Sequence, residues 1–412
     1  MKRILLGLIF IITCSALIFP GGGSQKADQK VTINVMDAQA YALERSDEVA
    51  QNFARLNNVN VVVQHNANNH PELLQARVNS GQVPDVFTHT IGPEVEAYAD
   101  FGVDWRNEPV LNLFRDDVLQ DCIKDGKVYT LPWIGEVYSL IYNKKVFRDA
   151  NITTLPRNLR ELEEVCIKIK NSGVTPFATG FGASWVLGHI ASSYFAAENT
   201  DARVTVNAIS SGQKSLADLT YFKNVFDLID MMLKYGPDKP LEYDWERSEA
   251  ALAAGEAGII HMGSWAEAIF KQFNPDIEMG FIPTPVAFDN SFEPKIAAGT
   301  GWGYIVHKDG KNVDIAKKFL EYYLTSDDAV DFMSQAHGAI PPLKKQPANI
   351  NGQLSNDASR YVAQGLVLPW AFNRYPAGAN LFISDTLQAY AAGDVSREDA
   401  MRMMTNEWRM LK

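Results

Sequence analysis

The segment 31–88 alternates between strand-like and helix-like hydrophobic patterns, and this rhythm constrains the fold more than any other feature of the chain. Strands are predicted where β-branched residues cluster in short runs, and amphipathic helices where apolar residues recur every three to four positions. The predicted strands are 31–36, 60–65 and 85–88, and the predicted helices are 46–56 and 71–80. Such alternation predicts an α/β fold whose mainly parallel sheet is flanked by helices. Because ligands bind beyond the carboxyl ends of parallel strands, the loops 37–41 and 88–92 are candidate binding loops.

The same alternation continues through the rest of the chain. Further strands are predicted at 128–133, 138–142, 174–179, 257–262, 280–283 and 303–306. Further helices are predicted at 155–171, 221–235, 248–255, 313–324, 327–337, 353–366, 379–391 and 396–410. At ~100–200 residues per domain, a chain of this length is expected to form two or three domains, each with its own core.

The first residues have the pattern of an export signal. Lys2 and Arg3 precede an apolar run over 4–19, which is shorter than a membrane span and is broken by Pro20 and three glycines. We therefore expect a signal peptide over 1–23, followed by a polar, flexible tether over 24–30. Cys14 leaves two alternatives open, a lipid anchor at this cysteine or cleavage near the glycine run. Either way the mature protein is expected to be periplasmic or otherwise extracytoplasmic.

Charge and cysteine content exclude several functions. The formal net charge is −11, and it becomes −13 (36 − 49) without the leader, which argues against a nucleic-acid partner. The two remaining cysteines, Cys122 and Cys166, are expected to be unpaired, buried thiols in different lobes. His65 and His70 lack the spacing of a metal site, so we expect neither a metal nor a cofactor.

Several short motifs occur in an order that resembles a known family. The motifs are Val83-Pro84-Asp85-Val86, Asp125-Gly126-Lys127-Val128-Tyr129, Leu131-Pro132-Trp133, Ser139-Leu140-Ile141-Tyr142-Asn143-Lys144, Gly263-Ser264-Trp265, Gly280-Phe281-Ile282-Pro283 and Ala339-Ile340-Pro341. Together they resemble the extracellular solute-binding proteins of bacterial ABC importers, in particular the carbohydrate-binding, maltose-binding-protein-like family 1. The resemblance covers nearly the whole chain after the leader.

This resemblance implies two α/β lobes joined by hinge crossings, as in type II periplasmic binding proteins. It implies a first lobe of 31–137 and 296–338 and a second lobe of 138–295 and 339–412. It also implies a monomeric, non-enzymatic protein that captures a sugar or oligosaccharide and delivers it to the membrane permease of an ABC importer. Two alternatives remain, the same fold binding a polyamine or another small polar ligand, and an exported glycosidase.

A sugar site needs aromatic platforms for the ring faces and polar side chains for the hydroxyls. Trp265 follows a buried strand through Gly263 and Ser264, so it is the strongest candidate platform, with a core position as the alternative. Trp370 and Arg374 are four residues apart, which would place them on one face of a helical turn beside Asn373. In the family resembled, a Trp and an Arg at this spacing line the cleft.

The remaining candidate ligand-binding residues rest on weaker arguments. The family resembled has a Glu at the position of Glu136 that accepts ligand hydroxyls. Trp133 and Trp302 are expected either to stack on the ligand or to pack at the hinge, and Trp185 is expected on a loop. Asp37 and Gln39 lie in the first candidate loop, where the family pattern has charged residues. The full candidate set is Trp265, Glu136, Trp370, Arg374, Trp302, Trp133, Ser264, Asn373, Trp185, Asp37 and Gln39.

Overall fold

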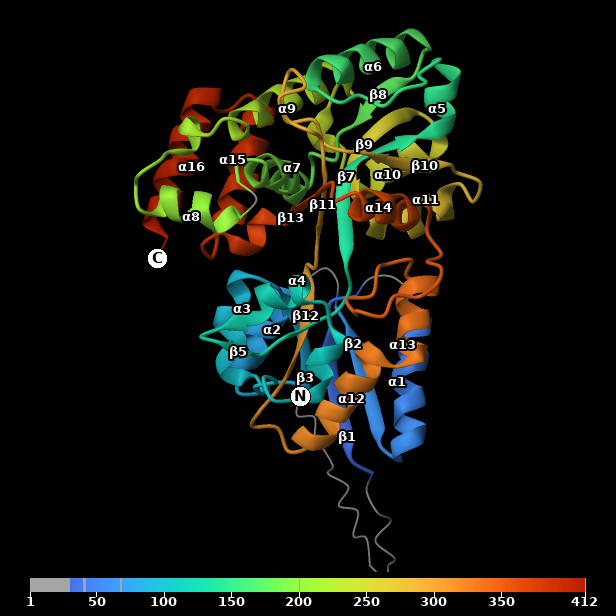
Figure 1. The fold of residues 1–412 in the computed structure, drawn as a ribbon, viewed down its shortest axis with the longest axis vertical. Coiled ribbons are helices and arrows are strands. Elements are labelled where there is room, and N and C mark those ends of the chain that lie inside the picture. Colours follow the sequence, from blue (N-terminus) through green and yellow to red (C-terminus); the bar gives the residue numbers. More distant parts are fainter. Residues whose placement is uncertain (1–29, 40–41, 67–68, 200, 412) are drawn as a thin grey trace, which may run out of the picture.

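The computed structural model describes residues 30–39, 42–66, 69–199 and 201–411. The predicted signal peptide, Cys14 and all but the last residue of the predicted tether lie outside these residues. Two bodies, one above the other in Figure 1, each surround their own β-sheet, and a few extended segments connect them. This arrangement confirms the expected α/β fold with two lobes.

The first lobe contains a five-stranded sheet with the order β2-β1-β3-β12-β6. Its strands are β1 (Thr32–Asp37), β2 (Asn60–His65), β3 (Val86–Thr90), β6 (Leu131–Pro132) and β12 (Trp302–Val306). β1 runs parallel to β2 and β3, as the strand–helix rhythm predicted, whereas β12 runs antiparallel to β3 and β6. The sheet is therefore mixed, because β12 enters it from the other lobe without a helical crossover.

The second lobe contains a six-stranded sheet with the order β13-β11-β7-β9-β8, and β10 pairs with β7. Its strands are β7 (Glu136–Asn143), β8 (Thr175–Ala178), β9 (Ala257–Gly263), β10 (Met279–Ile282), β11 (Ile296–Gly299) and β13 (Val367–Pro369). β8 pairs in parallel with β9, and β11 with β13, while β7 is antiparallel to β9, β10 and β11. This sheet is mixed too, because β7 runs against all the other strands, which share one direction. In each lobe a single strand therefore departs from the expected, mainly parallel direction.

Helices pack on both sheets. In the first lobe they are α1 (Leu43–Asn57), α2 (His70–Asn79), α3 (Pro93–Tyr98), α4 (Asp116–Leu119), α12 (Val313–Thr325) and α13 (Asp327–Asp331). In the second lobe they are α5 (Lys144–Asp149), α6 (Leu159–Asn171), α7 (Ser184–Ala196), α8 (Ala202–Ser210), α9 (Val225–Tyr235), α10 (Trp245–Ala254), α11 (Glu267–Phe273), α14 (Gln353–Ala363), α15 (Ala379–Ala392) and α16 (Arg397–Met410). α1 shows why such helices form, since Val49, Ala50 and Phe53 share one buried face.

Three segments cross between the lobes. The first runs from β6 to β7 through residues 133–135, and the second from β11 to β12 through Thr300 and Gly301. β11 therefore belongs to the second lobe, so placing 296–299 in the first lobe was wrong. The third crossing follows Leu343, because Ala339 and Leu343 still pack in the core of the first lobe, whereas Leu354 packs in that of the second. The predicted boundary after residue 338 was thus too early.

Candidate functional site

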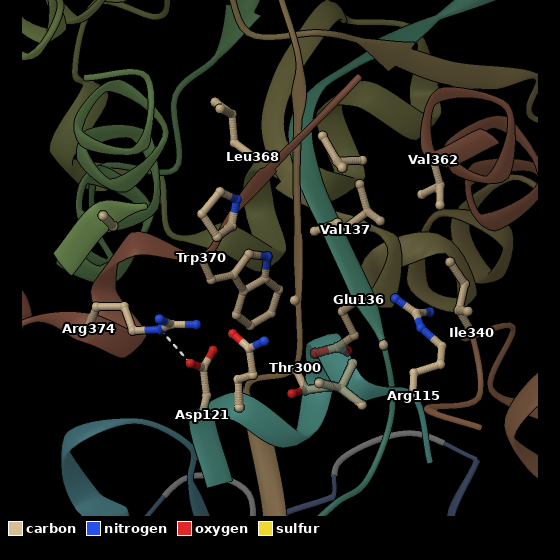
Figure 2. A pocket seen from close by; sticks show the side chains of 18 of the residues that line it. Arg115, Asp121, Glu136, Val137, Thr300, Ile340, Val362, Leu368, Trp370 and Arg374 are labelled. Carbon is tan, nitrogen blue, oxygen red and sulfur yellow. Dashed lines mark ion pairs between the residues drawn. The ribbon is translucent and has the colours of Figure 1, made fainter. Parts of the chain in front are cut away.

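A cavity of about 430 Å³ lies between the lobes, beside the first two crossings (Figure 2). The first lobe contributes side chains near α4, the second contributes α8 and the segment around β13, and both crossings line it. The lining residues are Arg115, Val118, Gln120, Asp121, Gly135, Glu136, Val137, Asp201, Ala202, Arg203, Ala298, Gly299, Thr300, Ile340, Val362, Val367, Leu368, Pro369, Trp370 and Arg374. A ligand held here would contact both lobes at once.

Trp370 forms part of the cavity wall directly after β13. Its indole lies against the second crossing, where a Cβ atom on Gly299 would come within 2.7 Å of the ring, and one on Gly301 within 2.8 Å. Only glycine at these two positions allows the backbone to approach the ring so closely. The Trp370 side chain is consequently buried, and among the described residues no group hydrogen-bonds its indole N–H.

Arg374 lies on the same wall and connects the lobes. A short 3-10 helix, η9 (Ala371–Arg374), follows Trp370 and forms the helical turn between the two residues. The Arg374 guanidinium forms an ion pair with Asp121 of the first lobe (Figure 2). The side-chain amide of Asn373 donates a hydrogen bond to the carbonyl of Thr300 at 3.0 Å. Asn373 therefore fixes the second crossing, while Arg374 reaches into the cavity.

Glu136 is the first residue of β7 and also lines the cavity. Its side chain is largely buried, and burial raises the pKa of this carboxyl from 4.5 to about 8. Within the described part of the chain, no hydrogen bond or ion pair to the carboxyl is found. Glu136 is thus a neutral acid near pH 7, able both to donate and to accept a hydrogen bond.

Trp265 does not line this cavity but belongs to an aromatic cluster behind Trp370. The two indoles meet edge to face with centroids 6.2 Å apart, and the Tyr138 ring lies 6.5 Å from Trp265. Trp265 remains half-exposed. Its indole folds back over Gly263, where an added Cβ would lie 2.0 Å from a ring carbon. Ser264 has a structural role, since its hydroxyl accepts a hydrogen bond from the backbone N–H of Val137 at 3.2 Å.

Trp185 was expected on a loop, but it lies in the first turn of α7. This helix was not predicted, because its buried residues surround it and leave no amphipathic period. One turn further along, His189 contacts Trp185 with ring centroids 5.1 Å apart. His189 was not predicted as a site residue, although its i, i+4 spacing from Trp185 places both rings on one helix face.

In the first lobe, the two candidate tryptophans have different environments. Trp133 is buried in the core and meets Tyr304 and His337 edge to face, so it is a packing residue here. Trp302 begins β12 directly after the second crossing and is half-exposed. It meets His70 at right angles, with centroids 5.8 Å apart. Trp302 therefore remains a candidate for ligand contact, on the opposite side of the crossing from Trp265.

Asp37 and Gln39 lie inside the first lobe rather than on the cavity wall. The Asp37 carboxylate accepts a hydrogen bond from the Tyr304 hydroxyl at 3.0 Å and lies 3.2 Å from Nδ1 of His65. Its Oδ1 also accepts the backbone N–H of Gln39 at 3.2 Å. Burial lowers the pKa of His65, but the hydrogen bonds that its ring donates to the carboxylates of Asp37 and Asp47 outweigh this and hold the pKa above its ordinary value. Neither residue lines the cavity between the lobes, and the ligand role of Asp37 and Gln39 stays a prediction.

The two cysteines behave as predicted. Cys122 and Cys166 are free and buried, one in each lobe. Burial raises the pKa of both thiols, which keeps them protonated and unreactive. Across the described ranges, no helix is both long and apolar enough to span a bilayer.

Comparison with known proteins identifies relatives over most of the chain. The family model described as bacterial extracellular solute-binding protein matches residues 38–330. The diacetylchitobiose binding protein DasA of Streptomyces coelicolor is 25% identical over 87% of this chain and 86% of its own. The multiple sugar-binding protein of Streptococcus mutans is 23% identical over 78% of each chain. A third relative is an uncharacterized ABC transporter extracellular-binding protein of Pyrococcus horikoshii, which is 24% identical to this chain over the matched residues. That match spans 67% of this chain and only 62% of the relative.

Solved structures share the fold. The solute-binding protein RafE in complex with raffinose superimposes with a TM-score of 0.77, at 21% identity over 92% of this chain and 99% of the other. A sugar transporter protein of Bacillus licheniformis in complex with stachyose gives a TM-score of 0.73, at 18% identity over 93% and 100% of the chains. At these identities the likeness is one of fold.

Proposed function

Because the chain belongs to the bacterial extracellular solute-binding proteins, we propose that it captures a sugar or oligosaccharide between its lobes and delivers it to an ABC importer. The partner is the membrane permease of that importer, and the ligand is released chemically unchanged. The observation that carries this proposal is the cavity between the lobes, whose wall combines the Trp370 indole with the polar groups of Glu136 and Arg374. Relatives that are named for binding sugars support the same ligand class.

The wall chemistry suits a neutral polyol. An indole packs against the C–H face of a sugar, while a carboxylic acid and a guanidinium hydrogen-bond its hydroxyls. Trp265 and Trp185 on the second lobe and Trp302 on the first extend this aromatic surface on either side of the second crossing. A ligand drives the two lobes to close only when it binds the closed state better than the open one. Contacts from both lobes provide this difference in affinity.

The charges in the cavity favour a sugar over the alternatives. A polyamine requires carboxylates that are free to bind an ammonium group, and a glycosidase requires two that flank the scissile bond. Asp121 is paired with Arg374, and Asp201 with Arg203 at 2.9 Å, so neither is free. Glu136 is neutral near pH 7. We therefore assign a non-enzymatic, sugar-carrying function to a monomer.

The location follows from the family and the leader. Residues 1–23 direct export, and the mature protein acts outside the cytoplasm as other extracellular solute-binding proteins do. Lipidation of Cys14 would tether it to the membrane surface next to its permease. Mass spectrometry of the protein released from its native membrane decides between a lipidated Cys14 and cleavage near the glycine run.

A thermal-shift screen tests the ligand class. The purified protein is heated alone and with raffinose, stachyose, maltotriose, diacetylchitobiose or spermidine. A ligand that binds only the folded state at one hundred times its Kd stabilises it by about 2.7 kcal/mol, which raises the melting temperature. We expect a rise with at least one sugar and recovery of that sugar intact after incubation. A rise with spermidine alone, or cleavage of the sugar, would overturn the proposal.

A further inference from the structure

His189 lies at the centre of the aromatic cluster of the second lobe. Its imidazole stacks on Tyr138, with centroids 4.7 Å apart and planes at 14°, and on Phe372, at 5.2 Å and 25°. Two indoles stand steeply against it, Trp185 at 71° and Trp265 at 60°. Trp185 and Trp265 are themselves 6.4 Å apart. The three rings of His189, Trp185 and Trp265 therefore form a triangle, which we call the ring triangle.

The ring triangle faces solvent, whereas the rings beneath it do not. His189, Trp185 and Trp265 are each half-exposed, while Tyr138 and Trp370 are buried. The triangle also lies at the end of the second lobe that adjoins the crossings. Tyr138 is only two residues after Glu136, and it pairs in the sheet with Gly263 at the carboxyl end of β9. His189 and Trp265 of the triangle also contact Trp370, which lines the cavity between the lobes.

In the part of the chain that the structure describes, the two ring nitrogens of His189 have no hydrogen-bond partner. Among the described residues, none hydrogen-bonds to either nitrogen, and the only hydrogen bond of His189 to another side chain is through its backbone carbonyl. Neither nitrogen belongs to the fully buried polar atoms without a partner, so the polar edge of the ring is not completely cut off from solvent. Packing alone would be served equally well by phenylalanine, which has no polar edge to satisfy.

We infer that His189 is a ligand-binding residue, whose imidazole hydrogen-bonds a hydroxyl of a sugar ring held against Trp185 and Trp265. This inference rests on the proposed function and adds a polar contact at the centre of an otherwise aromatic surface. Burial lowers the pKa of the imidazole to about 3, so it is neutral at physiological pH. A neutral imidazole has one donor and one acceptor nitrogen, and a hydroxyl can complement either. A ligand that has no hydroxyl next to the imidazole would remove water from the ring nitrogens of His189 without giving them a hydrogen-bond partner.

Isothermal titration with raffinose, stachyose, maltotriose and diacetylchitobiose tests this role in three variants. His189→Phe keeps a stacking ring without nitrogens, and we expect it to weaken the binding of each sugar that the wild type binds by at least about tenfold. His189→Gln restores a donor and an acceptor and should recover part of the affinity. His261→Gln is the control, because the His261 ring is also near Tyr138, with centroids 5.8 Å apart, but is buried. The Kd of this variant for each sugar should stay within about twofold of the wild-type value.

The outcomes separate the possible explanations. Unchanged affinity in His189→Phe would show that the ring nitrogens do not contribute to binding. An equal loss of affinity in His261→Gln would show that the packing around Tyr138, and not a contact of His189 with the sugar, sets the affinity. Either result would overturn the inference. If His189→Phe does not fold, nitrogen NMR shifts of the wild-type imidazole with and without the bound sugar replace it, and an absence of any shift overturns the inference equally. Wild-type protein that binds none of the four sugars would instead refute the proposed function.

Discussion

The Arg374 guanidinium and the Asp121 carboxylate form an ion pair that joins the second lobe to the first across the cavity. Each side chain is only 16% exposed, so the pair is shielded from solvent more than most surface ion pairs. Burial raises the pKa of Asp121, and the charge of Arg374 offsets this only in part. The relative position of the lobes in this structure therefore depends in part on one electrostatic contact.

Asp121→Asn should loosen this arrangement of the lobes. Without the carboxylate, the guanidinium stays inside the cavity with its charge uncompensated, which costs about 1–3 kcal/mol. We expect a larger radius of gyration by small-angle X-ray scattering and a lower melting temperature. Arg374→Gln and the double variant complete a thermodynamic cycle, and strictly additive effects would show that the two side chains do not interact in solution.

Glu136→Gln should stabilise the protein at alkaline pH. Burial raises the pKa of this carboxyl from 4.5 to about 8, so the folded state holds a proton that the unfolded state has lost. The stability from that proton is complete below pH 4.5 and is lost as the pH rises through about 8. The variant has no such loss, so we expect it to exceed the wild type by about 1–3 kcal/mol at pH 8.5 and to equal it near pH 4.

Chemical denaturation of both proteins across this pH range measures the difference. Glu249, whose pKa burial raises to about 9, adds a similar slope, but it is present in both proteins and cancels. A stability difference that does not change with pH would mean that the Glu136 carboxyl is already ionised at neutral pH.

Local patterns were sufficient to predict most elements of the fold. β1, β2 and α1 were found within a few residues, because one buried face imposes a clear period on each. α7 was missed because it is buried on all sides, and such a helix carries no period. The side of the hinge to which β11 belongs was also mistaken, since a short apolar strand such as Ile296–Gly299 fits either sheet equally well.

The site could be predicted only in part, for a different reason. Trp370 and Arg374 were named for their spacing and Glu136 from the family resemblance, and all three line the cavity. Asp121 was not named, because its role depends on a contact with a residue far along the chain. Ser264 was named too, and its hydroxyl accepts a hydrogen bond from the backbone N–H of Val137. A single sequence does not indicate which polar residues are already satisfied by the fold.

Gly263→Ala should displace the Trp265 indole. Gly263 has extended backbone angles that alanine can adopt, so the only conflict is the new Cβ, which would lie 2.0 Å from the ring. We expect a shift in tryptophan fluorescence, a loss of about 1–3 kcal/mol of stability from overpacking, and weaker sugar binding. Gly310→Ala is a milder control in the first lobe, with its nearest contact at 3.1 Å, and should leave the fluorescence unchanged.

Trp265→Ala should weaken sugar binding by about 1–3 kcal/mol, if stacking on the exposed part of the indole contributes as aromatic contacts usually do. Calorimetric titration measures the affinity, and a melting curve measures the stability. Trp265→Phe should retain part of the affinity. A large drop in melting temperature with unchanged affinity would assign Trp265 to the core.

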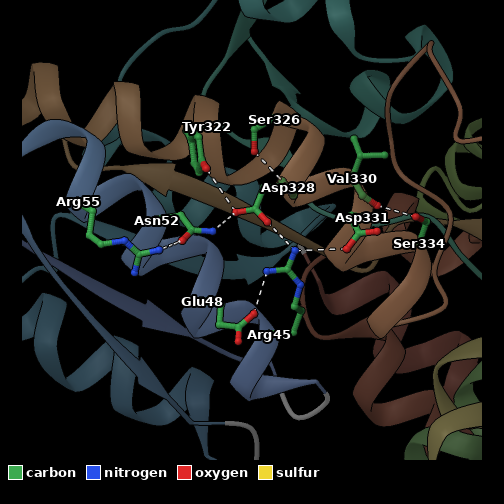
Figure 3. Close-up of polar contacts among 11 residues, drawn as sticks. Arg45, Glu48, Asn52, Arg55, Tyr322, Ser326, Asp328, Val330, Asp331 and Ser334 are labelled. Carbon is green, nitrogen blue, oxygen red and sulfur yellow. Dashed lines mark hydrogen bonds and ion pairs between the residues drawn. The ribbon is translucent and has the colours of Figure 1, made fainter.

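Asp328 connects the helices that cover the first lobe (Figure 3). Its carboxylate accepts hydrogen bonds from Arg45 and Asn52 of α1, both at 2.5 Å, and from the Tyr322 hydroxyl of α12 at 3.3 Å. Burial raises the pKa of Asp328, but the hydrogen bonds from Asn52 and Arg45 outweigh it and hold the pKa below its ordinary 3.8. The ionised carboxylate therefore stabilises the packing of α1 against α12 and α13.

Asp328→Ala should lower the free energy of unfolding by about 1–3 kcal/mol at pH 7, because two donors on α1 lose their charged acceptor. A depressed pKa stabilises the fold above the unfolded-state value and ceases to do so as the pH falls through the folded-state value. The difference between variant and wild type should therefore shrink below pH 3.8. Asp331→Ala is the matched control, since Asp331 is more exposed and contacts Arg45 only at 3.3 Å. Denaturation curves in which both variants lose equal stability would refute the central role of Asp328.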